Sequence, residues 1–258
     1  MRELERAAAE LPPALPRHVA VIGRGRLGSA IAPALRAAGC DVVGPLGRGT
    51  PPAADAVLLC VPDAEIPAAA EACAGVAPLV GHTSGATPLD ALAPARAEAF
   101  GLHPLQTFTA DGGSFEGIGC ATGGTTPRAL ATADALARCL GMQPFELDDA
   151  DRPAYHAAAS IASNFLVTLE AAAEQVGATA GLPRELLVPL VEQTVANWAA
   201  LGPERALTGP VARGDEATVA RQRDAVEAAA PELLPLWDEL VAATRALPTA
   251  PTAQLPAR

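Results

Sequence analysis

The sequence predicts an α/β domain built on a doubly wound parallel sheet, followed by an all-helical C-terminal domain. Three observations support this fold class. Short apolar runs alternate with helical stretches between residues 18 and 147, which is typical of parallel βαβ units. A glycine-rich turn follows the first apolar run, at residues 23–28. After residue 148 no further strand-like run occurs, and the pattern becomes helical.

Each expected strand is a short apolar run bounded by turn residues. The run at 56–61 (AVLLCV) is continuous, which indicates a strand buried on both faces. The expected strands are 18–22, 41–43, 56–61, 79–82, 99–102, 118–122 and 143–147. The expected helices between them are 27–38, 64–74 and 128–140, the first of them ended by Gly39.

The glycine turn has the spacing of a dinucleotide-binding loop, GRGRLG, between a strand and a helix. Gly23 allows the tight turn, Gly25 lets the backbone approach a pyrophosphate, and Gly28 lets helix and strand pack closely. Arg26 and Leu27 stand where the helix begins; they are candidates for cofactor binding, because a helix N-terminus attracts negative charge. We therefore expect residues 17–149 to be a Rossmann-type domain that binds a dinucleotide.

The C-terminal part is expected to be helical at 151–177, 183–200, 215–229 and 231–247, with glycine and proline between the helices. The sequence thus predicts an N-terminal extension (1–16), the Rossmann-type domain (17–149), an all-helical domain (150–247) and a disordered tail (248–258).

Composition excludes several classes of function. The net charge of −11 over 258 residues argues against binding to nucleic acid or to anionic lipid, which both need a basic surface. The chain has no lysine, so catalysis by a lysine is excluded. Its five cysteines form no Cys-x-x-Cys pair, and we expect neither a disulfide framework nor a metal site. No secretory signal or membrane-spanning run is evident, so we expect a cytoplasmic protein.

The end of the second strand favours NADP over NAD. An NAD site usually has an acidic residue there, to accept hydrogen bonds from the ribose. Asp41 stands at the start of that strand instead, and the following segment GPLGR contains Arg48 and no acid. An arginine at this place can pair with a 2′-phosphate. The alternative for Arg48 is a solvated loop residue.

Two further loops leave the sheet at the edge where ligands bind in such folds. Val61, Pro62 and Asp63 follow the third strand; Asp63 is expected mainly to cap the next helix, and the segment can also line the cofactor groove. His82 and Ser84 follow the fourth strand, in the small-residue loop HTSGA. Ser84 is our candidate for a contact near the nicotinamide, and His82 is a weaker candidate.

The candidate catalytic groups lie after the fifth strand and on the first helix of the second domain. His103 begins the segment HPLQTF, in which Gln106 is a candidate for substrate binding. His156, Ser160 and Asn164 are spaced by four residues and would share one face of an α-helix. Either a catalytic role or ordinary structural hydrogen bonding accounts for these residues.

A compact break between later helices, TGPVARGD, supplies Thr208 and Arg213. Arg213 can hold a substrate carboxylate through a two-point interaction. The alternative is a structural ion pair between Arg213 and Asp215.

These motifs in this order resemble a family of bacterial Rossmann-like proteins that carry a DUF2520 C-terminal domain. The resemblance rests on GRGRLG, VPD, HTSGA, HPLQTF, YHAAASIASNF and LTGPVARGD. That family resembles a larger group with a 6-phosphogluconate-dehydrogenase-like helical domain, which includes ketopantoate reductases, pyrroline-5-carboxylate reductases and β-hydroxyacid dehydrogenases. The resemblance implies NADP-linked reduction between the domains and a homodimer formed through the helical domain.

One position departs from the hydroxyacid branch of that group. Its motif Lys-x-x-x-Asn would place a lysine where Ser160 stands and an asparagine at Asn164. Since the lysine is missing, His156 or His103 would have to supply the proton.

We therefore expect an NADP(H)-dependent oxidoreductase that reduces a small carbonyl or imine acid, with a ketopantoate-like 2-oxo acid favoured. An alternative is a non-catalytic NADP(H)-binding protein that senses redox state. A third and weaker hypothesis, hydride exchange with a deazaflavin, has little support from a chain with only 3% aromatic residues.

Overall fold

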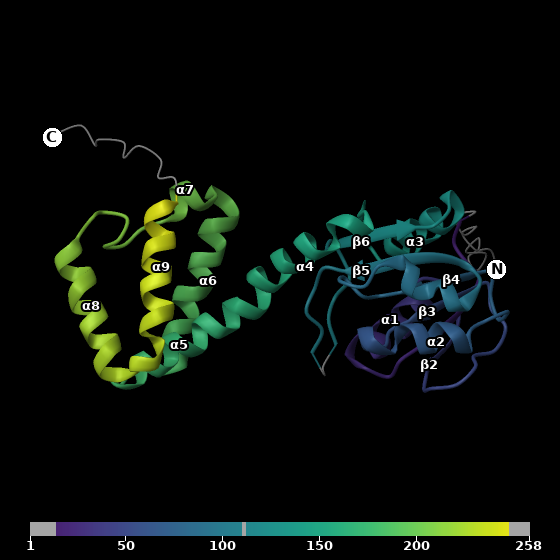
Figure 1. The fold of residues 1–258 in the computed structure, drawn as a ribbon, viewed down its shortest axis with the longest axis horizontal. Coiled ribbons are helices and arrows are strands. Elements are labelled where there is room, and N and C mark those ends of the chain that lie inside the picture. The colour runs from purple at the N-terminus through teal and green to yellow at the C-terminus, as the bar shows by residue number, and fades with distance from the viewer. Residues whose placement is uncertain (1–13, 110–111, 248–258) are drawn as a thin grey trace, which may run out of the picture. The chain divides into compact units, whose positions relative to one another are not determined.

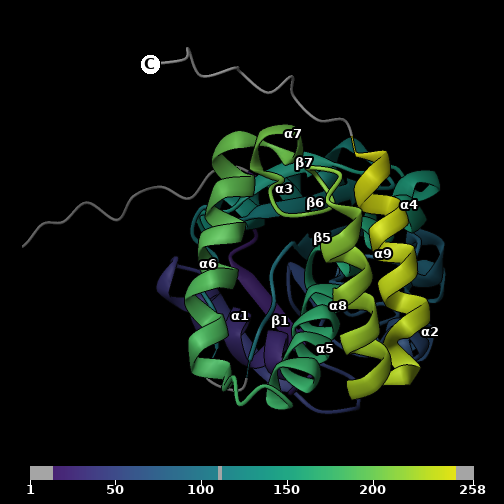
Figure 2. The ribbon, with the colours of Figure 1, turned by 90° about the vertical axis from the view of Figure 1, so that its left-hand side faces the viewer.

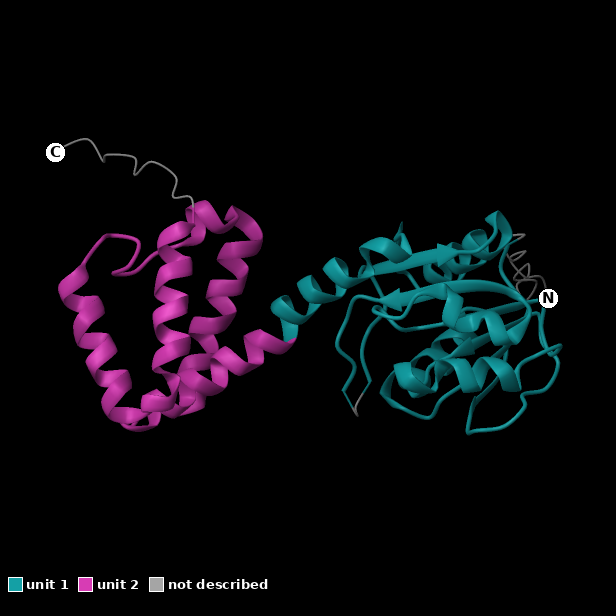
Figure 3. Ribbon diagram, in the orientation of Figure 1, with its two compact units in different colours: residues 1–163 teal, residues 164–258 magenta. Residues whose placement is uncertain are grey.

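The structure is a computed structural model that describes residues 14–109 and 112–247. The chain divides into two units, residues 1–163 and 164–258 (Figure 3). This boundary lies later in the chain than the expected division at 149/150. The tail expected at 248–258, and most of the extension expected at 1–16, lie outside the described residues.

A seven-stranded sheet forms the centre of the N-terminal unit, with the order β2-β1-β3-β4-β5-β6-β7 (Figure 1). The fold class is confirmed: the unit is α/β with a mostly parallel sheet, and helices follow it. The strands are β1 (His18–Ile22), β2 (Asp41–Leu46), β3 (Ala56–Leu59), β4 (Leu79–His82), β5 (Glu98–Pro104), β6 (Gly119–Gly124) and β7 (Gln143–Glu146).

One pair in the sheet departs from the expected parallel arrangement. β6 runs antiparallel to β5, with Leu102 opposite Thr122, whereas β7 is parallel to β6. A parallel pair needs a long crossover connection, usually a helix, but an antiparallel pair does not. The segment between β5 and β6 holds no helix among its described residues, and so the chain returns in the opposite direction.

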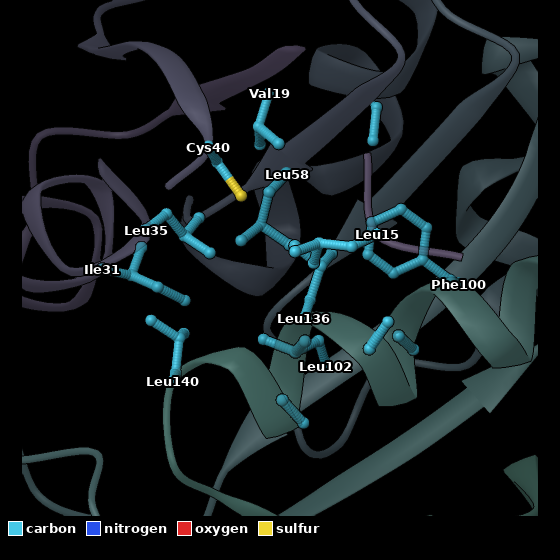
Figure 4. Close-up of a cluster of buried hydrophobic side chains, with 14 of the residues drawn as sticks. Leu15, Val19, Ile31, Leu35, Cys40, Leu58, Phe100, Leu102, Leu136 and Leu140 are labelled. Atoms are coloured by element: carbon cyan, nitrogen blue, oxygen red, sulfur yellow. The ribbon is translucent and has the colours of Figure 1, made fainter. Parts of the chain in front are cut away.

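Helical segments cover the sheet on both faces. They are α1 (Arg26–Ala37), η1 (Asp63–Glu65), α2 (Ile66–Ala72), η2 (Leu89–Ala95) and α3 (Pro127–Cys139). Alternate residues of each buried strand belong to different cores, as the two-residue period of a strand requires. Leu58 packs with α1 and α3, whereas Leu59 packs with α2 and η2. Figure 4 shows the first of these cores, around Leu35, Leu58 and Phe100.

The second unit is helical, as expected. After η3 (Asp149–Asp151), one continuous helical stretch crosses the unit boundary: α4 (Arg152–Ser160), a π-helical turn (Ile161–Phe165) and α5 (Leu166–Ala178). The remaining helices are α6 (Arg184–Leu201), α7 (Pro203–Ala206), α8 (Glu216–Ala229), η5 (Pro231–Leu233) and α9 (Leu234–Ala246) (Figure 2).

Helices α8 and α9 form an antiparallel pair within this unit. The Arg223 guanidinium donates two hydrogen bonds to the Asp238 carboxylate, each 2.9 Å long. Arg245 and Glu216 form a further ion pair at the other end of the two helices, 2.6 Å apart. Val219 and Val226 of α8 are buried.

Candidate functional site

A pocket of about 590 Å³ opens at the carboxyl ends of β1, β2 and β3. In a parallel sheet these ends meet at one edge, which is where ligands bind in doubly wound folds. The pocket is lined by the glycine loop, by the loop after β2 and by the segment from the end of β3 to α2. Its lining residues include Gly23, Arg24, Gly25, Leu46, Arg48, Cys60, Val61, Pro62 and Glu65.

The three loop glycines meet different surroundings. A Cβ atom at Gly23 would lie 2.0 Å from the Cys60 carbonyl oxygen, and one at Gly28 would lie 2.0 Å from the Gly23 oxygen. At Gly25, a Cβ atom would meet nothing within 4 Å. Gly23 and Gly28 thus allow close packing of the loop, whereas Gly25 leaves open space at the N-terminus of α1. That space and the unpaired amides of a helix N-terminus fit a pyrophosphate.

Two arginines flank the exit of β2. The Arg24 guanidinium packs against Gly47, since a Cβ atom there would lie 3.7 Å from its central carbon. Arg48 forms an ion pair with Glu65, 2.8 Å apart, but its side chain is 89% exposed. A pair this exposed contributes about 0–1 kcal/mol, so an anion of higher charge can replace Glu65 as the partner of Arg48. Asp41 lies at the other edge of the sheet, near His18.

A buried ion pair lies farther along the same edge. Arg152, the first residue of α4, is only 2% exposed. Its Nε donates to Asp149 Oδ1 at 2.5 Å, and its Nη1 donates to the Ser84 carbonyl at 3.4 Å. Gly101 in β5 makes room for the guanidinium, since a Cβ atom there would lie 2.9 Å from Nη2. This arrangement ties the start of α4 to the loop after β4.

His103, near the end of β5, is part of the same group of polar residues. Its Nδ1 lies 2.6 Å from the Tyr155 hydroxyl of α4, and the two rings meet edge to face at 88°. Burial above all, together with the nearby His156 and Arg152, lowers the pKa of His103 to about 4. Burial raises the pKa of Tyr155 to about 12. At neutral pH both side chains are therefore uncharged.

His82, the last residue of β4, and Ser84, in the loop after it, both have structural roles. His82 is fully buried, and its Nδ1 accepts a hydrogen bond from the Ser84 amide at 3.2 Å. Burial lowers the pKa of His82 to about 4. The Ser84 hydroxyl accepts from the amide of Thr87 at 2.9 Å and bonds to the Thr87 hydroxyl at the same distance. Ser84 thus closes the turn, and it does not line the pocket.

Other predicted residues of the N-terminal unit lie away from the pocket. Asp63 caps no helix; it begins η1, whose N-cap is Pro62, and it does not line the pocket. Arg26 and Leu27 are absent from the lining as well. Gln106 is exposed, and its side chain accepts a hydrogen bond from the Thr107 amide.

The helix that carries His156, Ser160 and Asn164 differs from the expected one. Residues 161–165 form a π-helical turn, which holds more residues per turn than an α-helix. Asn164 therefore lies in this turn, and not in the regular α-helix that the sequence predicted. His156 and Ser160 belong to the first unit, and His156 is exposed.

Asn164, Thr208 and Arg213 belong to the second unit. Arg213 is exposed in the loop between α7 and α8. The expected alternative, an Arg213–Asp215 ion pair, is absent from the described residues. Asp215 caps α8 instead, accepting from the Thr218 amide at 3.1 Å.

Sequence reasoning missed Tyr155, Arg152 and Asp149. Arg152 and Tyr155 are three residues apart and therefore share a face of α4. The polar face predicted from the sequence starts at His156, one residue later. The sequence does contain a signal for them. The only tyrosine of the chain stands three residues after an arginine, and this arginine follows several aspartates.

Comparison with protein families identifies the C-terminal part of the chain. Residues 118–244 match the family described as "Domain of unknown function (DUF2520)". The chain contains a DUF2520 domain. The DUF2520 match begins at the end of the loop before β6, so it includes part of the sheet as well as the helices. No curated protein matches the sequence significantly.

The fold of the DUF2520-containing chain is shared with several solved structures. One, from Bacteroides fragilis, is of a protein proposed to be an NADP oxidoreductase: TM-score 0.77, 21% identity, covering 90% of this chain and 98% of that one. The protein TM1727 from Thermotoga maritima gives a TM-score of 0.69 and 24% identity, over 88% and 96% of the two chains.

A third similar structure is a pyrroline carboxylate reductase from Plasmodium falciparum with NADP bound. Its TM-score is 0.57 and its identity 13%, over 89% of this chain and 98% of that one. The DUF2520-containing chain thus has the fold of NAD(P)-dependent reductases. Among the described residues, no helix is long and apolar enough to cross a membrane, and no group of three metal-ligating side chains is found.

Proposed function

We propose that the protein is an NADP(H)-dependent oxidoreductase that reduces a small carbonyl or imine acid, with a ketopantoate-like 2-oxo acid favoured. One observation carries the proposal. The pocket beside the dinucleotide-type glycine loop lies on the same edge of the sheet as a group of polar side chains, which includes His103, Tyr155 and Arg152. The fold shared with NAD(P)-dependent reductases supports it. When bound, NADPH would supply the hydride.

The residues around the pocket favour NADP over NAD. Gly23 and Gly25 would cradle the pyrophosphate, and Arg24 and Arg48 flank the place where the adenine ribose would lie. A 2′-phosphate carries two negative charges near neutral pH, whereas a ribose hydroxyl carries none. Two guanidinium groups therefore favour the phosphorylated cofactor.

The first test measures cofactor preference by fluorescence titration with NADPH and NADH. We expect NADPH to bind more tightly. The substitutions Arg24→Gln and Arg48→Gln should each weaken NADPH binding about 10- to 100-fold, the value of one charge-assisted hydrogen bond, and leave NADH binding unchanged. Arg138→Gln is the matched control, since Arg138 lies on α3 in an exposed ion pair with Asp134. Equal loss of NADH binding would contradict the assignment of a phosphate site.

The second test follows NADPH oxidation with ketopantoate, other 2-oxo acids and cyclic imines. We expect turnover with at least one of them. Confirmed NADPH binding together with no turnover across the panel would contradict the reductase and favour the non-catalytic alternative.

We also propose that the protein is a homodimer formed through its helical unit. Many large apolar side chains of this unit are exposed in the single chain, among them Val167 (69%), Leu186 (65%), Leu190 (64%) and Trp198 (59%). Monomeric proteins rarely leave so much apolar surface in contact with water. A groove of about 450 Å³ between α5 and α6, lined by Val167, Leu187 and Val191, adds to this surface.

A further inference from the structure

Tyr155 and His103 form a hydrogen-bonded pair, and only one of the two was a candidate from the sequence. The Tyr155 hydroxyl lies 2.6 Å from His103 Nδ1. On its other side the phenol ring meets Phe145 of β7, with ring centroids 5.8 Å apart. The pair therefore has a fixed geometry between β5, β7 and α4, while both residues remain only partly buried.

The pair lies next to the end of the cofactor pocket. Cys60 and Val61, at the end of β3, line that pocket. The next loop is bonded to the same strand, since the Thr83 amide donates to the Leu59 carbonyl at 3.1 Å. Two residues on, Gly85 packs against His103: a Cβ atom there would lie 2.9 Å from Nε2. The His103 imidazole is thus connected to the wall of the pocket through the loop after β4.

The distance along this edge suits a dinucleotide. Neighbouring strands lie about 4.8 Å apart, and β4 and β5 are the second and third strands from β1 on this side. With its pyrophosphate at the glycine loop of β1, a dinucleotide needs to extend about 10 to 14 Å for its nicotinamide to reach the ends of β4 and β5.

The protonation states of the pair favour the phenol over the imidazole as an acid. With a pKa of about 4, only about one His103 in a thousand is an imidazolium at pH 7. The titratable groups around it are His156, Arg152 and His82, which lower its pKa, and Asp63, which raises it. Tyr155, in contrast, holds its proton throughout the physiological range. A phenol is still a stronger acid than the alcohol that a carbonyl reduction produces.

We propose that Tyr155 is the proton donor of the reduction and that His103 is its positioning residue. The assignment rests on the proposed function. The substrate carbon accepts the hydride that NADPH would supply, while the Tyr155 O–H bond breaks and its proton forms a new bond to the carbonyl oxygen or to the imine nitrogen. A carbonyl becomes an alcohol, an imine becomes an amine, and NADPH becomes NADP⁺. The phenolate accepts a hydrogen bond from the His103 Nδ1–H and regains its proton from water.

Arg152 supports this step without touching the substrate. It stands three residues before Tyr155 on α4, and its bonds to Asp149 and to the Ser84 carbonyl fix the start of that helix. Its positive charge also lowers the pKa of Tyr155, which is the direction that stabilises the phenolate. Arg152 is therefore a second positioning residue.

The first experiment needs no turnover. The chain has a single tyrosine, so tyrosine labelled with ¹³C at Cζ gives one NMR resonance, which reports on the phenol. We expect His103→Gln to shift this resonance by removing the hydrogen bond, and NADP⁺ to shift it in the wild type because the nicotinamide reaches the pair. The control His18→Gln changes a histidine at the opposite edge of the sheet and should not shift it.

The outcomes separate the two proposals. If calorimetry detects no binding of NADP⁺ or NADPH, the proposed function fails and the proton donor with it. If NADP⁺ binds and the Tyr155 resonance does not move, the proton donor alone is wrong.

The second experiment uses whichever compound of the carbonyl and imine panel is reduced. Tyr155→Phe removes only the hydroxyl, so we expect kcat to fall about 10²- to 10⁴-fold with an unchanged Kd for NADPH. His103→Gln should lower kcat less, and His18→Gln should not change it. Activity of Tyr155→Phe within about threefold of the wild type would overturn the assignment.

Discussion

Among single residues, the glycine loop contains positions at which close packing requires glycine and one position, Gly25, at which it does not. Gly28 lies against the backbone of Gly23, and any side chain there must displace it. Gly25 has an extended backbone, with φ of −71°, and open space in front of it. The fold alone therefore tolerates a side chain at Gly25 and not at Gly28.

This difference can be measured with two alanine substitutions. Gly28→Ala should cost about 1–3 kcal/mol of folding free energy, as overpacking does, and lower the melting temperature. Gly25→Ala should leave the melting temperature nearly unchanged and weaken NADPH binding at least about tenfold, because its methyl group occupies the place of the pyrophosphate. Unchanged NADPH binding in Gly25→Ala would contradict the assignment of the pocket.

Single residues also show how much of the candidate site could be predicted from the sequence. Several residues predicted to bind the cofactor line the pocket, namely Gly23, Gly25, Arg48, Val61 and Pro62. Their positions were predictable because motif spacing and strand order determine where the loops lie. The directions of side chains are less predictable. Ser84 turns into its own loop, where its hydroxyl accepts a hydrogen bond from the Thr87 amide.

Among the elements, α4 depends most on a single polar contact. Its first residue, Arg152, is buried beside Asp149, which in turn accepts from the Leu89 amide at 2.9 Å. A buried guanidinium without its carboxylate is costly. The start of η2 and the start of α4 are thus held by one carboxylate.

Removing that carboxylate tests its role. Asp149→Asn should lower the free energy of unfolding by about 1–3 kcal/mol, less than for a fully buried pair because the Asp149 side chain is 39% exposed. Urea denaturation followed by circular dichroism measures this. In comparison, Arg138→Gln breaks an ion pair in which the arginine is 63% exposed and should change the stability by at most about 0.5 kcal/mol. An equal effect of both substitutions would show that Asp149 has no special structural role.

Element boundaries followed closely from the sequence where the pattern was periodic. β1 and β4 have the expected bounds, at His18–Ile22 and Leu79–His82. The π-helical turn after α4 had no such signal, since its residues fit an α-helical pattern equally well. The direction of β6 had a signal in the missing crossover helix, but periodicity alone does not specify direction.

For the whole molecule, the two units bury their apolar residues to different degrees. The sheet has a core on each face. In the helical unit, Val219, Val226 and Ala230 are the buried hydrophobic residues within the described part of the chain. Large apolar side chains of that unit, such as Leu190 and Trp198, are exposed in the single chain, which supports the proposed homodimer.

Light scattering after size exclusion tests this directly. The wild type should have twice the mass of the chain. Leu190→Glu should shift it towards the single chain, because the exposed leucine (64%) tolerates a charge in the monomer and a dry interface does not. Gln222→Glu on α8, another exposed position, adds the same charge as a control and should remain dimeric. A monomeric wild type would contradict the dimer.

Hydrophobic periodicity and glycine spacing are local properties of the chain, and so the fold class, the order of the elements and the glycine loop could be predicted from the sequence. Which side chains meet could be seen only in the folded structure. Tyr155 reaches His103 across 52 positions of the chain, and Arg152 lies buried beside Gly101. Such contacts depend on how β5 and α4 pack, and packing is a property of the whole fold that no local pattern encodes.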